Sequence, residues 1–264
     1  MKQFLAIFLL FTIGCNNAPE KEAEALKMSG AYKMTSLSVK NDQTDTTYSS
    51  LLQLKIFTDD LVMYANVNPS DSVSGFGIGS YTSNQDTVTE NILYNANDTS
   101  KNDNPGSFKL IIEKSATGYK QVIPDMQWTD STKMTLTENY ESVGTSASSS
   151  IDGLWKQVKN YTVKGTDTSM NEMTQYKMYG AGHFMYGHSW ADSTKKLHTG
   201  VGFGTFAMEG TNKIKESVTA STYSEQKGQN YDLAIEMTST DEYKQTITSA
   251  DGTKYVEFYQ RVKK

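Results

Sequence analysis

Residues 55–64, KIFTDDLVMY, recur 122 positions later as residues 177–186, KMYGAGHFMY. Further pairs keep the same order at nearly the same shift: Gly30-Ala31-Tyr32-Lys33 with Gly153-Leu154-Trp155-Lys156, Gly77 to Tyr81 with Gly202 to Phe206, Phe108 to Glu113 with Tyr231 to Glu236, and Tyr119-Lys120-Gln121 with Tyr243-Lys244-Gln245. A period of more than 100 residues has the length of a domain rather than of a solenoid unit. The chain is therefore predicted to be a tandem duplication in which each copy has its own core.

The boundary between the copies is set by a short polar segment. Residues 144–150, GTSASSS, have the composition of a flexible linker. This places domain 1 at residues 29–143 and domain 2 at residues 151–264.

Within each copy the dominant hydrophobic period is two. Phe108, Leu110 and Ile112 alternate with Lys109, Ile111 and Glu113, and the matching residues of the second copy alternate in the same way. β-rich runs separated by polar turn signals cover Leu51 to Phe57, Leu61 to Val67, Gly75 to Thr82, Thr87 to Tyr94, Tyr119 to Ile123, Lys133 to Tyr140, Gln175 to Tyr179, His183 to His188, Gly200 to Met208, Asn212 to Tyr223, Tyr231 to Met237, Lys244 to Thr248 and Tyr255 to Val262. Residues 250–253, ADGT, are typical of a hairpin turn. The pattern predicts an all-β protein of two tandem antiparallel up-and-down β-barrels.

The second copy begins with a Gly-x-Trp sequence, Gly153-Leu154-Trp155. The chain's single arginine, Arg261, lies near the end of the same copy. This pair resembles the signature of the calycin superfamily, and the copy as a whole resembles lipocalin-like domains of proteins exported by Bacteroidetes, whose role is mostly unassigned. The resemblance implies that Trp155 closes one end of the barrel and that Arg261 packs across it, a cation–π contact of roughly 0.5–2 kcal/mol. The first copy has Tyr32 in place of the tryptophan.

The N-terminus carries an export signal. Lys2 precedes a run of eight apolar residues from Phe4 to Phe11, too short to span a bilayer, and Gly14 precedes the only cysteine, Cys15. This resembles a bacterial lipoprotein signal, which implies that residues 1–14 are removed, that Cys15 is acylated and that residues 15–28 form a tether. The expected location is a cell-envelope membrane, with the outer membrane favoured, and the protein is expected to face either the periplasm or the cell surface. The alternative is an ordinary signal peptide with an incidental cysteine.

Composition and motifs exclude several functions. A net charge of −5 argues against nucleic-acid binding, which needs a dense cationic face. The glycine-rich runs at 75–79 and 200–204 do not lead into a helix, so they predict strand bends or close approach of backbone or ligand rather than a nucleotide site. We expect no metal site, because His183 and His188 point to opposite faces of one strand, and no cofactor. The paired glutamates of the two copies, Glu90 with Glu216 and Glu113 with Glu236, are expected to be exposed and not catalytic.

The remaining candidates are aromatic residues with polar tips that could line a barrel interior or mouth. An eight-stranded barrel is either filled by side chains or holds one small ligand. The leading hypothesis is a membrane-anchored, non-enzymatic protein that binds a small amphipathic or hydrophobic molecule; the alternative is an interaction module for a protein or a glycan, with the protein partner unknown. The ligand-binding candidates are Tyr64, Tyr81, Tyr94, Tyr186, Trp190, Phe203 and Phe206.

Overall fold

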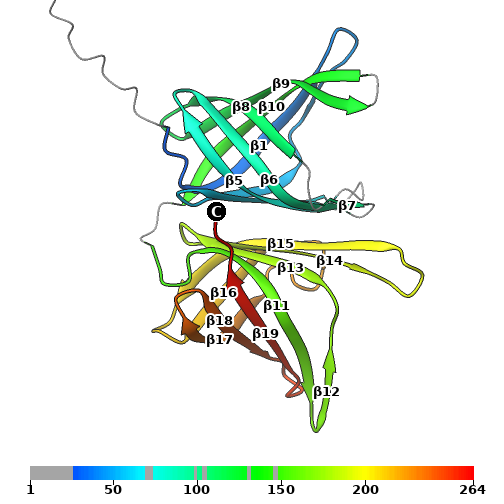
Figure 1. Cartoon of the computed structure of the whole chain (residues 1–264), viewed down its shortest axis with the longest axis vertical. Coiled ribbons are helices and arrows are strands. Elements are labelled where there is room, and N and C mark those ends of the chain that lie inside the picture. Colours follow the sequence, from blue (N-terminus) through cyan, green and yellow to red (C-terminus); the bar gives the residue numbers. More distant parts are fainter. Residues whose placement is uncertain (1–25, 69–73, 98–99, 103–105, 130–131, 145–147) are drawn as a thin grey trace, which may run out of the picture.

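The computed structural model describes residues 26–68, 74–97, 100–102, 106–129, 132–144 and 148–264. The expected signal peptide, the acylation site Cys15 and most of the tether lie outside these residues. Every regular element in the described part is a β-strand, and all strand pairs are antiparallel (Figure 1). No helix in this part is long and apolar enough to cross a bilayer.

Eight strands of the first copy form a closed ring. Its last strand pairs with its first, from Ala31↔Gly144 to Lys40↔Thr135, so barrel 1 has no open edge between them. Two short strands, β2 (Asp45–Tyr48) and β7 (Ser100–Asn102), add to β1 and β6 outside the ring. In ring order the strands are β1 (Gly30–Lys40), β3 (Leu52–Phe57), β4 (Leu61–Val67), β5 (Gly75–Asn84), β6 (Thr87–Asn97), β8 (Gly106–Lys114), β9 (Gly118–Thr129) and β10 (Thr132–Gly144).

The second copy closes in the same way, through pairing of its first and last strands. The ring consists of β11 (Gly153–Lys164), β13 (Thr174–Gly180), β14 (His183–Ala191), β15 (Leu197–Met208), β16 (Lys213–Ser221), β17 (Asn230–Ser239), β18 (Glu242–Thr248) and β19 (Lys254–Arg261), and β12 (Asp167–Met170) pairs with the outer part of β11. Two closed eight-stranded barrels in tandem confirm the predicted all-β fold of two antiparallel β-barrels.

The strand runs read from the sequence are all present, and the turn at 250–253 joins β18 to β19 with Gly252 at a φ of +82°. Five strands were not predicted from the sequence. β1 and β11, which open the two copies, mix polar and apolar residues without clean alternation, and β2, β7 and β12 are only three or four residues long.

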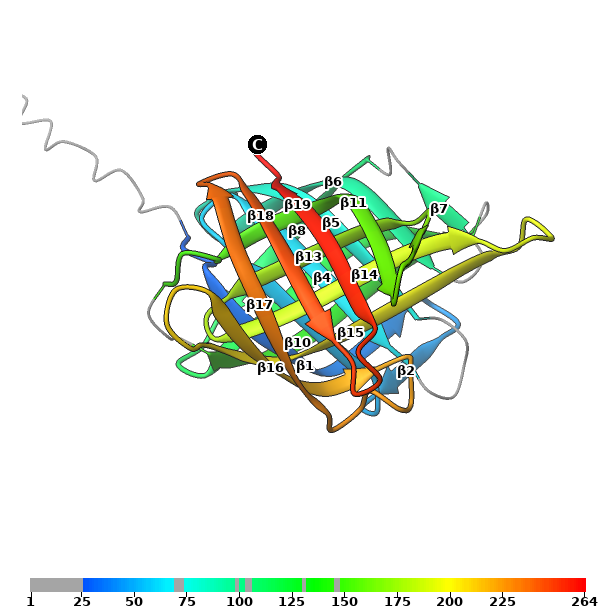
Figure 2. The ribbon, with the colours of Figure 1, turned by 90° about the horizontal axis from the view of Figure 1, so that it is seen from below.

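The two barrels pack against each other through an apolar interface. Strands β3 to β6 of barrel 1 face β13 to β15 of barrel 2, and β4 also contacts β11, as the stacked barrels of Figure 1 and the end-on view of Figure 2 show. Phe76 lies on the backbone of Gly187, and Tyr94 Oη is 2.6 Å from Ser189 Oγ across the interface. A single cluster of buried residues therefore spans both domains. Its members include Leu54, Ile56, Met63, Phe76, Ile78, Met178, Met185, Val201 and Phe203.

In the glycine-rich strands β5 and β15, tyrosine side chains of the neighbouring strands lie against two of the glycines, whereas the sequence predicted bends or close approach of backbone or ligand. A Cβ at Gly77 would lie 2.5 Å from the ring of Tyr64, and a Cβ at Gly202 would lie 2.5 Å from Tyr186. Glycine at these inward positions lets each ring lie flat on the neighbouring strand. The apolar residues between the glycines point outward into the interface between the barrels.

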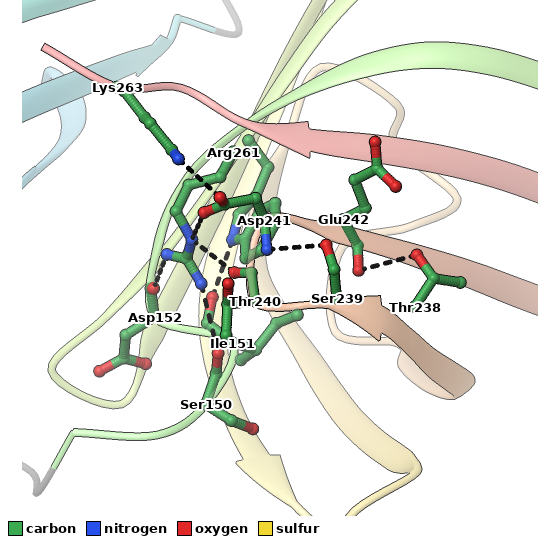
Figure 3. Close-up of polar contacts among 11 residues, drawn as sticks. Ser150, Ile151, Asp152, Thr238, Ser239, Thr240, Asp241, Glu242, Arg261 and Lys263 are labelled. Carbon is green, nitrogen blue, oxygen red and sulfur yellow. Dashed lines mark hydrogen bonds and ion pairs between the residues drawn. The ribbon is translucent and has the colours of Figure 1, made fainter.

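The end of barrel 2 at which β11 begins and β19 ends is closed by Trp155, which is fully buried and donates a hydrogen bond from Nε1 to the carbonyl of Ile151 at 2.8 Å. The Arg261 guanidinium lies 4.0 Å from the centre of the indole ring. It also donates to the carbonyls of Asp152 (2.6 Å) and Thr240 (3.0 Å), which ties three segments together (Figure 3). In barrel 1 Tyr32 occupies the corresponding place and packs edge-on against Tyr119.

We expect Arg261→Ala to destabilise barrel 2 by about 1–3 kcal/mol, because it removes the cation–π contact and leaves backbone carbonyls without their donor. Hydrogen exchange of β11, β18 and β19 should accelerate in urea more than that of β1, β9 and β10. Lys263→Ala is the control, since Lys263 is exposed and pairs with Asp241 as Arg261 does. Equal acceleration in both barrels would contradict the prediction.

Candidate functional site

The interior of barrel 1 contains a buried ion pair. Lys55 on β3 and Glu90 on β6 are 3% and 4% exposed, and their charged atoms are 2.6 Å apart. Lys55 Nζ also donates to Gln121 Oε1 on β9 at 3.3 Å. Because an isolated charge at this depth would cost several kcal/mol, each partner depends on the other.

A second carboxyl group extends this network. Glu138 on β10 accepts hydrogen bonds from Gln121 Nε2 (2.5 Å) and Tyr140 Oη (2.9 Å). Tyr140 in turn accepts one from Gln53 Nε2 on β3. Burial raises the pKa of Glu138 above its usual value, although Lys55 and the two donors oppose the shift.

Barrel 2 contains the same network at the equivalent positions. Lys177 pairs with Glu216 at 2.7 Å and donates to Gln245 at 3.2 Å. Glu257 accepts from Gln245 (2.6 Å) and Tyr259 (2.8 Å), and burial raises its pKa as well. Gln175 donates to Tyr259 as Gln53 does to Tyr140. The duplication has thus kept a set of six polar residues inside each barrel.

Each network borders an internal cavity, of about 200 Å³ in barrel 1 and about 170 Å³ in barrel 2. The two cavities share ten lining positions, at which polar network residues meet apolar or aromatic side chains. In barrel 1 these are Gln53, Lys55, Tyr64, Asn66, Glu90, Ile92, Phe108, Gln121, Ile123 and Glu138; in barrel 2 they are Gln175, Lys177, Tyr186, His188, Glu216, Val218, Tyr231, Gln245, Ile247 and Glu257.

One shared lining position carries a polar atom without a partner in both cavities. Asn66 Oδ1 and His188 Nδ1 are buried and have no hydrogen-bond partner among the residues that the structure describes. A buried polar atom left unpaired costs about 1–3 kcal/mol. Burial lowers the pKa of His188 to about 4, so its imidazole is neutral at neutral pH.

A loop from β16 to β17 reaches over the cavity of barrel 2. Tyr223 Oη lies 2.8 Å from His188 Nε2, and Gln226 accepts a hydrogen bond from Tyr186 Oη. The cavity of barrel 2 is therefore closed on this side by side chains that hold its lining residues in place.

The seven aromatic residues proposed as ligand-binding candidates lie in four different environments. Tyr64 and Tyr186 line the two cavities. Tyr81 and Phe206 pack in the closed cores of their barrels, while Tyr94 and Phe203 lie outside the barrels, in the interface. Trp190 borders a different groove at the rim of barrel 2.

The expected exposure of the paired glutamates was wrong for one pair. Glu113 and Glu236 are exposed, as expected, and pair with surface lysines. Glu90 and Glu216 are buried, because the lysines of β3 and β13 lie opposite them inside the barrels. The matching lysines, glutamines and glutamates of the two copies are the sequence signal that could have identified the network.

The histidines do not form a common site. His183 Nδ1 contacts the carbonyl of Ala181, and His198 pairs with Asp192 at 2.9 Å. Within the described residues, no three His, Cys, Asp or Glu side chains are grouped so that they could hold a metal ion.

Comparison with known proteins gives no family. No family model matches the chain, and no curated protein matches it. A solved structure of a protein of unknown function from the DUF3598 family of Nostoc punctiforme aligns with 89% of this chain and 96% of its own, at 10% identity and a TM-score of 0.27. This likeness is too low to assign a family or a function.

We predict that Glu138→Gln/Glu257→Gln makes stability less dependent on pH. The raised pKa of each carboxyl means that its contribution is full below the unfolded value, about 4.5, and is lost as the pH rises through the folded value. The free energy of unfolding of the variant, relative to wild type, should therefore increase between pH 4.5 and 7.5.

Urea unfolding at a series of pH values measures this difference. Glu113→Gln/Glu236→Gln is the matched control and should shift stability by less than about 0.5 kcal/mol, because both carboxylates are exposed. A difference in unfolding free energy that stays constant with pH would argue against raised pKa values of Glu138 and Glu257.

Proposed function

We propose that the protein binds a small amphipathic molecule in each of its two barrels, without chemical turnover. The observation that carries this proposal is the repetition of one cavity in both barrels, with ten equivalent lining positions and an unpartnered polar atom at the same place. Two barrel domains of this kind fit a ligand-binding calycin-like fold. The fold alone does not give a function; the lining residues of the two cavities support this one.

The polar side of each cavity favours a ligand whose head group donates hydrogen bonds. Each network sets two carboxyl groups against one ammonium group, so acceptors outnumber cations around the cavity. Asn66 Oδ1 accepts such a hydrogen bond, and so does His188 Nδ1 in the tautomer whose Nε2–H donates to Tyr223 Oη.

The apolar lining of each cavity favours an apolar tail. It includes Ile123, Met126 and Leu136 in barrel 1, and Val218 and Ile247 in barrel 2. Sites for drug-sized ligands usually measure roughly 300–1,000 Å³, so cavities of about 200 Å³ and 170 Å³ suit a small molecule or one end of a longer one.

We further propose that the chain is exported and anchored in a cell-envelope membrane through an acylated Cys15. The short apolar run before Gly14-Cys15 and the polar tether after it support this location. An anchored binding protein would meet amphipathic molecules where they are concentrated, at the membrane surface.

Native mass spectrometry after incubation with an envelope lipid extract tests the binding proposal. We expect two small-molecule adducts per chain. Ile123→Trp and Ile247→Trp each fill one cavity and should each remove one adduct, while Ile111→Trp, at an exposed position of β8, should remove none. A persistent apo mass, or adducts that survive both cavity substitutions, would refute the proposal.

Cys15→Ser tests the anchor. In the native host the wild-type chain should sediment with membranes and incorporate labelled fatty acid, and the variant should do neither, because the acylated sulfur is missing. Asn16→Ser is the control and should remain bound to membranes. Sedimentation of the Cys15→Ser chain with membranes would exclude acylation as the means of attachment.

A further inference from the structure

A groove of about 410 Å³ lies at the rim of barrel 2, apart from the internal cavities. It forms where β11 ends its pairing with β13 at Lys156 and begins pairing with β12 at Tyr161. The residues between these two ladders leave a notch in the barrel wall. Its lining includes Gln157, Lys159 and Asn160 of β11, Glu172, Trp190 of β14 and Lys101 of β7.

Two buried amides on β11 border this groove. Gln157 and Asn160 are each 7% exposed, and Asn160 Nδ2 donates a hydrogen bond to Gln157 Oε1 at 2.5 Å. The other amide atoms, Gln157 Nε2 and Asn160 Oδ1, have no hydrogen-bond partner among the described residues. The pair thus offers one free donor and one free acceptor, whose burial is costly until a ligand satisfies them.

An aromatic surface lies in the same groove. The Trp190 indole stacks on His198, with ring centres 5.3 Å apart and planes 21° apart, and His198 is held by Asp192. A fixed indole provides an apolar face beside the polar amides.

The charged side chains around the groove favour neither an anionic nor a cationic ligand. Lys159 Nζ lies over the rings of Tyr161 and Phe258, at 5.5 and 5.6 Å from their centres. The other charged lining residues, Lys101 and Glu172, are of opposite sign. A neutral ligand rich in hydrogen-bonding groups fits this balance better than an anion or a cation.

The amides belong to the second copy alone. The β-bulge of β1 matches that of β11, which aligns Met34 with Gln157 and Leu37 with Asn160. Met34 and Leu37 pack in the apolar core of barrel 1. An aliphatic pair is therefore compatible with the fold at these positions, and barrel closure does not require the buried amides.

We propose that the groove between β11 and β14 binds a neutral saccharide. Adjacent sugar hydroxyls both donate and accept hydrogen bonds, so they match the free donor of Gln157 and the free acceptor of Asn160. The apolar face of a pyranose ring packs on the Trp190 indole. This site is independent of the amphipathic ligand proposed for the barrel interiors.

The test is binding of the full mature chain to an array of neutral mono- to hexasaccharides, with calorimetric titration of each sugar that binds. We expect at least one saccharide to bind, and Gln157→Met/Asn160→Leu, which introduces the residues of barrel 1, to weaken it about tenfold or more. Trp190→Ala should weaken the same sugar. Gln229→Met, at an exposed position of barrel 2, is the control and should bind like wild type.

Absence of binding to every sugar on the array overturns the proposal, and so does binding that survives the amide substitutions or Trp190→Ala. Thermal unfolding identifies variants that do not fold. If the double variant does not fold, Trp190→Ala decides the question.

Discussion

Packing of the two barrels against each other deprives strands β3 and β13 of a solvent-facing side, and the interior chemistry depends on this constraint. Leu54 and Ile56 face the other barrel, so Lys55 between them points into its own barrel, 3% exposed. A lysine in that position cannot reach water and needs a carboxylate beside it, which Glu90 supplies at 2.6 Å. Because the interface is formed by both copies, the same argument applies to Lys177 and Glu216.

The fold could be predicted from the sequence because its determinants are local or repeated. Alternation of apolar residues marks individual strands, and the nearly constant shift between copies marks two domains. Which side chains face the barrel interior could not be predicted. In residues 52–57, LQLKIF, the same alternation of apolar and polar residues results whether Leu52 and Leu54 or Gln53 and Lys55 face the interior. The second barrel decides this by covering the leucines. Tyr94 and Phe203, expected in a cavity, lie in the interface for the same reason.

The candidate site was predictable in part. Tyr64 and Tyr186 line the cavities, whereas the polar network around them was not predicted. Its lysines and first glutamates recur at shifts of 122 and 126, but Glu138 and Glu257 are separated by only 119 positions. The first copy has a longer β9–β10 hairpin, with 17 positions from Gln121 to Glu138 against 12 from Gln245 to Glu257, and this difference hides the second carboxyl pair from a comparison at constant shift.

The glycines of β5 and β15 link the cavities to the interface. Gly77 and Gly202 leave room for the rings of Tyr64 and Tyr186 on the inner surface of the sheet, and those rings form part of the cavity walls. The intervening Ile78 and Phe203 enter the interface on the outer surface. A side chain at either glycine would push a tyrosine ring into the cavity or displace the strand that carries the interface. The space for a ligand in each barrel and the contact between the barrels are therefore set by the same strands.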